Sequence, residues 1–242
     1  LAPGQAPAPD SFREPWSARV DVGLDLDQRL KGLTWYSLYD VGFDGAWTYQ
    51  HEEKEPATLH VAVALPDAEG VYDGFRFLVN DEEVETQPVA GRIATKLEVS
   101  PGEVVTIGLA YKSRGLDAWS YVPSRSGRVQ RLDLSLKTNF AGVDFPENGL
   151  SPSKVQDDGD GKALAWGFEN ILSKQHIGVT MPQSIQPGQL AAQLSFTAPI
   201  SLLFFFLVIA VLAKLEKLDI HPVNYAFLGA SFFAFHLLFA YL

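Results

Sequence analysis

The acidic string DDGDG at residues 157–161 is the part of the sequence that most resembles a metal site. A calcium loop needs oxygen ligands at alternate positions and a bidentate acid later in the loop. Asp158 and Asp160 fit the alternation, but Lys162 occupies the next alternate position and the next glutamate is Glu169. Because a hairpin turn needs only Asp-Gly, we expect a turn here and predict no metal site.

Aromatic residues are concentrated in residues 34–50, TWYSLYDVGFDGAWTYQ. Trp35, Tyr39 and Trp47 could stack on sugar rings or on cations, which would make a groove for a glycan or for peptidoglycan. Large aromatic side chains also fill the cores of β sandwiches. We expect the core role here, with the groove as the alternative.

A loop is predicted over residues 111–121, YKSRGLDAWSY. It carries Arg114, Asp117 and Trp119, and the planar guanidinium of Arg114 could hold a carboxylate or a phosphate. An ion pair between Arg114 and Asp117 that closes a turn is the simpler interpretation, and we favour it over an anion site.

No catalytic signature is present in the sequence. The five histidines show no metal-ligand spacing, and neither GxSxG nor a glycine-rich phosphate loop occurs. The lack of cysteine excludes a disulfide scaffold and a cysteine-ligated zinc site, and a net charge of −10 argues against a nucleic-acid binder. We therefore predict a protein that is not an enzyme and holds no cofactor.

Charged residues are distributed unevenly along the chain. Of 19 basic and 29 acidic residues, 17 and 27 lie in residues 1–190, which leaves two of each kind in residues 191–242. This division predicts a Pro/Ala-rich linker at 1–17, a water-facing domain at 18–190 and a membrane part at 191–242.

Two apolar runs predict two transmembrane helices, at about 199–218 and 222–242. A helix of 20 residues spans about 30 Å, which is the thickness of the hydrocarbon layer. The short link KLEKLDIHP predicts a tight helical hairpin. Leu1 in place of an initiator methionine, and Leu242 without a polar flank, suggest that the chain is truncated at both ends.

Lysines near the helices predict the orientation in the membrane. Lys214 and Lys217 lie in the link between the helices, whereas residues 175–198 contain no Lys or Arg. Positive charge near helix ends marks the cytoplasmic side. We expect a multi-pass protein of a bacterial inner membrane, with the lipid bilayer as its partner and residues 1–190 in the periplasm.

Small residues recur along the second apolar run, at Ala226, Ala230 and Ala234. Such a face lets another helix approach closely, although it is also ordinary membrane composition. His236 lies within the same run. An ionisable residue inside a membrane is a candidate functional site, but we favour a neutral histidine bonded to a neighbouring helix.

The outer domain shows the two-residue period of β-strands. Val20, Val22 and Leu24 alternate with polar residues, and so do the leucines of 128–140. Further strands are predicted at 59–65, 75–79, 93–99, 104–111 and on both sides of the turn in 152–168, with hairpin turns at Asn80-Asp81 and Pro101-Gly102. We predict an all-β, antiparallel, sandwich-like domain.

The turn His221-Pro222-Val-Asn-Tyr225 before the second apolar run resembles the HPxxY turn of the CreD family of inner-membrane proteins. The segments LSLKTNFAGVDFPENGLSPSK (134–154) and ALAWGF (163–168) also resemble that family. The resemblance covers about residues 128–242. It implies a periplasmic β domain, further transmembrane helices of the same protein as packing partners, and a role in envelope integrity or stress response with no established enzymatic activity.

Our first functional prediction is therefore a CreD-like, non-catalytic envelope protein, in which strain or a ligand outside the cell changes helix packing through the connector 183–198. The alternative is a membrane-anchored module that binds a glycan, peptidoglycan or a small anion through the aromatic run or Arg114.

Overall fold

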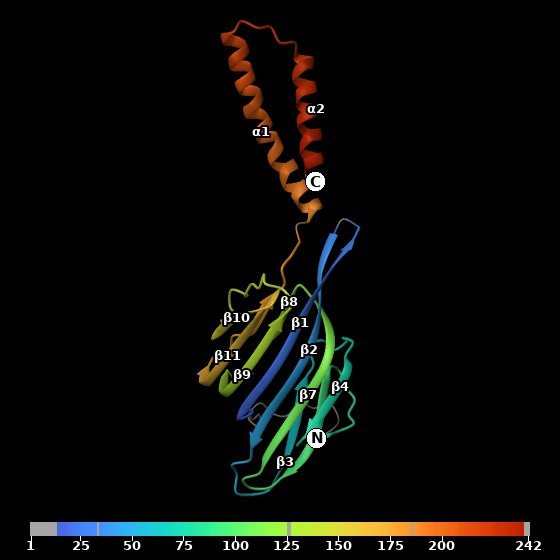
Figure 1. Ribbon diagram of the computed structural model, residues 1–242, viewed down its shortest axis with the longest axis vertical. Coiled ribbons are helices and arrows are strands. Elements are labelled where there is room, and N and C mark those ends of the chain that lie inside the picture. The colour runs from blue at the N-terminus through green and yellow to red at the C-terminus, as the bar shows by residue number, and fades with distance from the viewer. Residues whose placement is uncertain (1–13, 33, 125–126, 185, 240–242) are drawn as a thin grey trace. The chain divides into compact units, whose positions relative to one another are not determined.

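The computed structural model describes residues 14–32, 34–124, 127–184 and 186–239. Contacts divide the chain into two units (Figure 1). Unit 1 comprises the chain up to Gln28 together with Ser37–Pro182, and unit 2 comprises Arg29–Tyr36 together with the chain from Gln183 onward. Most of the predicted linker 1–17 lies outside the described residues. Its last residues contact the β domain, since the Trp16 amide donates to the Thr48 carbonyl at 2.8 Å.

Unit 1 is built on an eight-stranded sheet whose strand order is β10-β11-β9-β1-β2-β7-β4-β5 (Figure 1). Its strands are β1 (Ser17–Lys31), β2 (Thr34–Gln50), β4 (Asp73–Val79), β5 (Glu82–Glu83), β7 (Val104–Leu116), β9 (Arg128–Thr138), β10 (Lys154–Asp158) and β11 (Gly161–Leu172). Two smaller sheets pair β3 (Ala57–Ala64) with β6 (Arg92–Val99), and β8 (Ala118–Tyr121) with β12 (Ile177–Thr180). The prediction of a β-rich domain is confirmed.

The prediction that the sheet is antiparallel throughout was wrong. Strands β1 and β9 are parallel, with Val20 opposite Leu134 and Val22 opposite Leu136, so the large sheet is mixed. Parallel neighbours need a long crossover connection, and here the chain runs from the end of β1 at Lys31 to the start of β9 at Arg128. Side chains alternate in the same way in both kinds of pairing, and the alternation therefore does not reveal strand direction.

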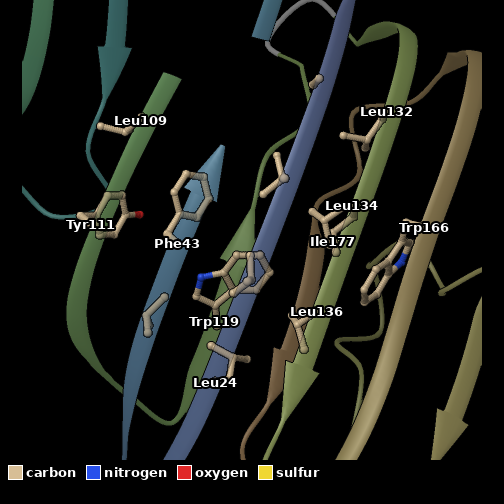
Figure 2. Close-up of a cluster of buried hydrophobic side chains, with 14 of the residues drawn as sticks. Leu24, Phe43, Leu109, Tyr111, Trp119, Leu132, Leu134, Leu136, Trp166 and Ile177 are labelled. Atoms are coloured by element: carbon tan, nitrogen blue, oxygen red, sulfur yellow. The ribbon is translucent and has the colours of Figure 1, made fainter. Parts of the chain in front are cut away.

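The hydrophobic core follows the predicted alternation. Val20, Leu24, Leu132, Leu134 and Leu136 are at most 2% exposed, and the charged residues between them face outward. Figure 2 shows these leucines converging with aromatic side chains from neighbouring strands.

The predicted turns form, but one of them connects different sheets. Asn80 and Asp81 both adopt positive φ and close the β4–β5 hairpin, and Gly159 at φ +62° opens the β10–β11 turn. The turn at Pro101-Gly102 also forms, with the Glu103 amide donating to the Ser100 carbonyl. It does not close a hairpin, however, because β6 pairs with β3 whereas β7 belongs to the large sheet.

Unit 2 contains two helices, α1 (Pro187–Leu215) and α2 (Pro222–Phe239). Helix α1 begins twelve residues before the predicted start, and Pro199 lies inside it. Pro187 already occupies the first turn, where a proline loses no helical hydrogen bond, and this feature marks the true start. Most of the predicted connector 183–198 is therefore helical.

Among the described helices, one is long and apolar enough to cross a membrane. It is the 20-residue stretch Phe196–Leu215 of α1, whereas the apolar stretch of α2, Pro222–Leu238, is shorter. Length and composition thus identify a single candidate span, and the membrane hairpin stays a prediction.

Candidate functional site

Aromatic side chains from the middle of β2 form a stacked cluster with those of β7 and β8. The rings of Phe43 and Tyr111, which are opposite each other in the β2–β7 register, are 5.0 Å apart and nearly parallel. Trp47 lies against Phe43 and donates from its indole nitrogen to the Tyr121 hydroxyl at 3.2 Å. Phe43 and Tyr111 are buried, and Figure 2 shows them within the core. Burial raises the pKa of Tyr111 and of Tyr121, because an ionised hydroxyl would be poorly solvated there.

Tyr39 is also a core residue, only 4% exposed, and its hydroxyl donates to the Ala118 carbonyl. Burial and then the charge of Asp117 raise the pKa of Tyr39 to about 12. Gly115 lies opposite Tyr39 across the β2–β7 ladder. A Cβ placed on Gly115 would lie 2.2 Å from Cζ of the Tyr39 ring, so only glycine leaves room for this ring.

Arg114 forms an ion pair with a residue that the sequence analysis did not select. It lies in β7 opposite Asp40 of β2, and its Nε and Nη2 donate to the two carboxylate oxygens of Asp40 at 2.7 and 3.3 Å. Both side chains are about half exposed. This hydrogen bond and the charge of Asp40 raise the pKa of Arg114. The anion-binding prediction required a forked contact between Arg114 and a carboxylate of a ligand. In the structure this contact is made with Asp40, a carboxylate of the chain itself.

The predicted loop over 111–121 was wrong. Residues up to Leu116 belong to β7 and those from Ala118 belong to β8, which leaves Asp117 alone at the turn between them. Asp117 adopts a φ of +64°, and its backbone bonds to Ser37 and Met181. A single residue in a left-handed conformation is enough to turn the chain between the two strands. Trp119 is 7% exposed and belongs to the core.

The six predicted ligand contacts therefore do not form one exposed surface. Tyr39 and Trp119 are buried, Trp47 is half-buried against Tyr121, and Trp35 lies in unit 2. A buried ring cannot stack on a sugar from solution. A shallow depression elsewhere in unit 1 is lined by Phe75, Phe77 and residues 83–87, none of which was a predicted contact.

The acidic string forms a hairpin turn, as expected. Asp157 is opposite Lys162, and the two side chains form an ion pair across the turn, while Asp158 lies 3.5 Å from Lys137. Asp157 and Asp158 thus each have a lysine beside them. Within the described part of the chain, no three His, Asp or Glu side chains come close enough together to hold a metal ion.

The most specific polar contact of unit 2 joins its two segments. The side-chain amide of Gln186 accepts from the Trp35 amide at 3.0 Å and donates to the Trp35 carbonyl at 2.7 Å. Gln186 thereby pairs with the β2 backbone as a neighbouring strand would, and it is also the N-cap residue of α1. These residues are 151 positions apart, and no local pattern in the sequence could have paired them.

Helix α2 meets α1 along the face that carries Tyr225 and Gly229. Tyr225 packs edge-on against Phe206 of α1, with ring centroids 5.4 Å apart, and Gly229 lies close to the same Phe206. Ala226, Ala230 and Ala234 are exposed, and in a helix they point away from the Tyr225 face. The alanine face therefore stays a prediction for another helix.

The two histidines of α2 have local partners. The Val223 amide donates to Nδ1 of His221 at 3.3 Å, which caps the start of the helix beside Pro222. Nδ1 of His236 lies 2.9 Å from the Phe232 carbonyl, one turn earlier in the same helix, and not on a neighbouring helix. The Phe232 ring also lies against the His236 ring, with ring centroids 4.1 Å apart and the two planes tilted by 37°. The HPxxY residues thus have capping and packing roles.

Comparison with known proteins gives no family. No family model matches the chain, and no curated protein matches it. Among solved structures, a putative nutrient-binding protein of Legionella pneumophila is 11% identical, with a TM-score of 0.46 over 69% of this chain and 68% of that one. An M1 zinc metallopeptidase of Deinococcus radiodurans is 11% identical, with a TM-score of 0.43 over 69% of this chain and 42% of the peptidase. Likenesses this weak support no functional inference.

Proposed function

We propose that this chain is a membrane-anchored protein of the bacterial inner membrane whose β domain lies in the periplasm. The observation that carries the proposal is the apolar surface of α1. Leu203 and Phe204 are each 62% exposed and Val208 is 52% exposed, within a 20-residue stretch long enough to span the hydrocarbon layer. A helix that is apolar on its exposed faces is stable in lipid and promotes aggregation in water.

The orientation follows from the lysines. Lys214 lies at the C-terminal end of the span and Lys217 follows it, whereas no basic residue lies in the 21 residues between Lys174 and Phe196. The positive-inside rule then assigns the α1–α2 link to the cytoplasm and the β domain to the periplasm.

Single-cysteine labelling tests this orientation, because the natural chain has no cysteine. Val71, 84% exposed, and Leu218, 63% exposed, provide one position on each predicted side. In spheroplasts, a membrane-impermeant maleimide should label Val71→Cys at once, and Leu218→Cys only after permeabilisation. Two results would refute the proposal. One is the reverse order of labelling. The other is equal labelling of both cysteines together with extraction of the chain from the membrane by alkaline carbonate.

We further propose that the role is non-catalytic and CreD-like, in envelope integrity or stress response. The resemblance of the HPxxY turn supports it, and so do the capping and packing roles of His221 and Tyr225. Cells that lack the gene should take up a hydrophobic dye faster under envelope stress, and the intact gene should restore the barrier. Unchanged uptake would count against this role.

A further inference from the structure

The tip of the β1–β2 hairpin, residues 29–36, has a composition unlike the rest of the chain. It contains Arg29 and Lys31 and no acidic residue, in a chain whose net charge is −10. Both basic side chains are exposed, and Leu30 and Tyr36 are 54% and 39% exposed. The tip therefore presents two cations beside an aliphatic and an aromatic side chain.

The same tip is hydrogen-bonded to the residue that precedes α1. Gln186 makes two hydrogen bonds with the Trp35 backbone, and Figure 1 shows the end of the hairpin beside the start of α1. Tip and helix thus belong to one unit of the structure.

Helix geometry sets the distance from this contact to the lipid. Ten residues separate Gln186 from Phe196, which begins the candidate span, and at 1.5 Å per residue this is about 15 Å. Thr34 continues β2 by one residue beyond Trp35, which is about 3 Å at the rise of a strand. The headgroup layer is about 5–8 Å thick on each side of the hydrocarbon core. For a tip that extends along α1, about 4–7 Å then remains between Thr34 and this layer, a distance that the long side chains of Arg29 and Lys31 can cover.

We propose that residues 29–32 and 34–36 form a lipid-binding tip that contacts anionic phospholipid headgroups on the side of the membrane where the β domain lies. Arg29 and Lys31 would bind phosphate oxygens, and Trp35 and Tyr36 have the amphipathic rings that are enriched at the membrane–water interface. The charges of the tip are complementary to such a surface, whereas the acidic chain around it would be repelled. This inference rests on the membrane insertion of α1 proposed above.

The test uses the full chain in vesicles of phosphatidylethanolamine and phosphatidylglycerol in equal parts, with a fluorophore on one introduced cysteine. Leu30→Cys reports on the tip, and Val208→Cys reports on the span. Val104→Cys is the control, since it is 52% exposed and pairs with Gln50, sixteen residues beyond Thr34 along β2. Lipids that carry a nitroxide quench a fluorophore only at close range. A nitroxide on the headgroup is therefore used for positions 30 and 104, and a nitroxide midway along the acyl chain is used for position 208, which lies about 18 Å from Phe196 along the helix.

We expect quenching at positions 30 and 208 and none at position 104. Quenching at 208 without quenching at 30 would overturn the lipid-binding tip and leave the membrane anchor in place. No quenching at 208 would overturn both.

Charge removal tests the proposed chemistry. Each basic residue near an anionic surface contributes about a fivefold preference for it, so Arg29→Gln with Lys31→Gln should lower the ratio of bound to free tip on the order of tenfold or more. In vesicles of phosphatidylcholine, which carry no net charge, the ratio of bound to free tip should fall in the same way for the unaltered chain. Lys96→Gln with Lys154→Gln removes two exposed cations of unit 1 and should change nothing. The proposal is overturned if the fluorophore at position 30 is quenched equally in the Arg29→Gln/Lys31→Gln variant and in the Lys96→Gln/Lys154→Gln variant.

Discussion

Replacing Gly115 with alanine should destabilise the β domain through Tyr39. A Cβ at position 115 would lie 2.2 Å from Cζ and 2.3 Å from Oη of that ring, well inside van der Waals contact. The ring must move, and it is buried with its hydroxyl bonded to the Ala118 carbonyl. Overpacking costs about 1–3 kcal/mol and an unsatisfied buried carbonyl about 1–3 kcal/mol, so we expect a total loss of about 2–6 kcal/mol.

Urea unfolding in detergent micelles, followed by tryptophan fluorescence, measures this loss. Gly42→Ala is the matched control, because Gly42 lies in β2 and a Cβ there meets nothing within 4 Å. It should change stability by no more than about 0.5–1 kcal/mol. In a Tyr39→Leu background, which lacks the clashing ring atoms, Gly115→Ala should cost less than about 1 kcal/mol.

The titration of Tyr39 gives a second measurement. Burial raises the pKa of Tyr39 to about 12, and a displaced ring would return toward 10. Tyr111 and Tyr121 also titrate late, so the Tyr39 signal is taken as the difference that Tyr39→Phe makes. If Gly115→Ala unfolds at the same urea concentration as Gly42→Ala and this difference is unchanged, the close approach of Tyr39 to Gly115 is refuted.

Three further predictions concern unit 1. Gly161→Ala should cost more than Gly115→Ala in the same urea assay, because the new Cβ would lie 1.7 Å from the Thr138 backbone carbonyl, which cannot rotate away. Arg114→Gln should leave the urea midpoint almost unchanged, since its pair with Asp40 is half exposed, and a clear loss of stability would mean that the pair is part of a buried network. Between pH 10 and 12 folded Tyr39 keeps a proton that the unfolded chain releases, so stability should fall by up to about 3 kcal/mol as pH rises through this window, as urea midpoints at several pH values would show. A flat profile there would contradict the burial of Tyr39.

The sequence predicted strands and their faces because that information is local. Leu132, Leu134 and Leu136 recur every second residue, and all three are buried in the structure. The parallel pairing of β1 with β9 joins residues that are more than a hundred positions apart, as Val20 and Leu134 are. Alternation determines which side of a strand is buried but not which strand lies next to it, so the mixed sheet could not be predicted.

The candidate site residues failed for the same reason. Asp117 is the acid nearest to Arg114 in sequence, but the register of two strands brings Asp40 opposite it. One signal was available: Ser37 interrupts the apolar series of β2 at a buried position, where its hydroxyl donates to the Pro182 carbonyl. A polar residue at a position where alternation expects an apolar one indicates a buried hydrogen bond.

The spacing of the HPxxY turn is explained by the requirements of a helix start. His221 supplies the acceptor that the free Val223 amide needs, and Pro222 fits the first turn because it has no amide to leave unpaired. Tyr225 comes one turn before Gly229, so both lie on the side of α2 that meets Phe206 of α1. Capping fixes where α2 begins and the aromatic contact fixes which face it turns to α1. The capping contact and the aromatic contact therefore explain the spacing of His221, Pro222 and Tyr225 structurally, without a chemical role for His221.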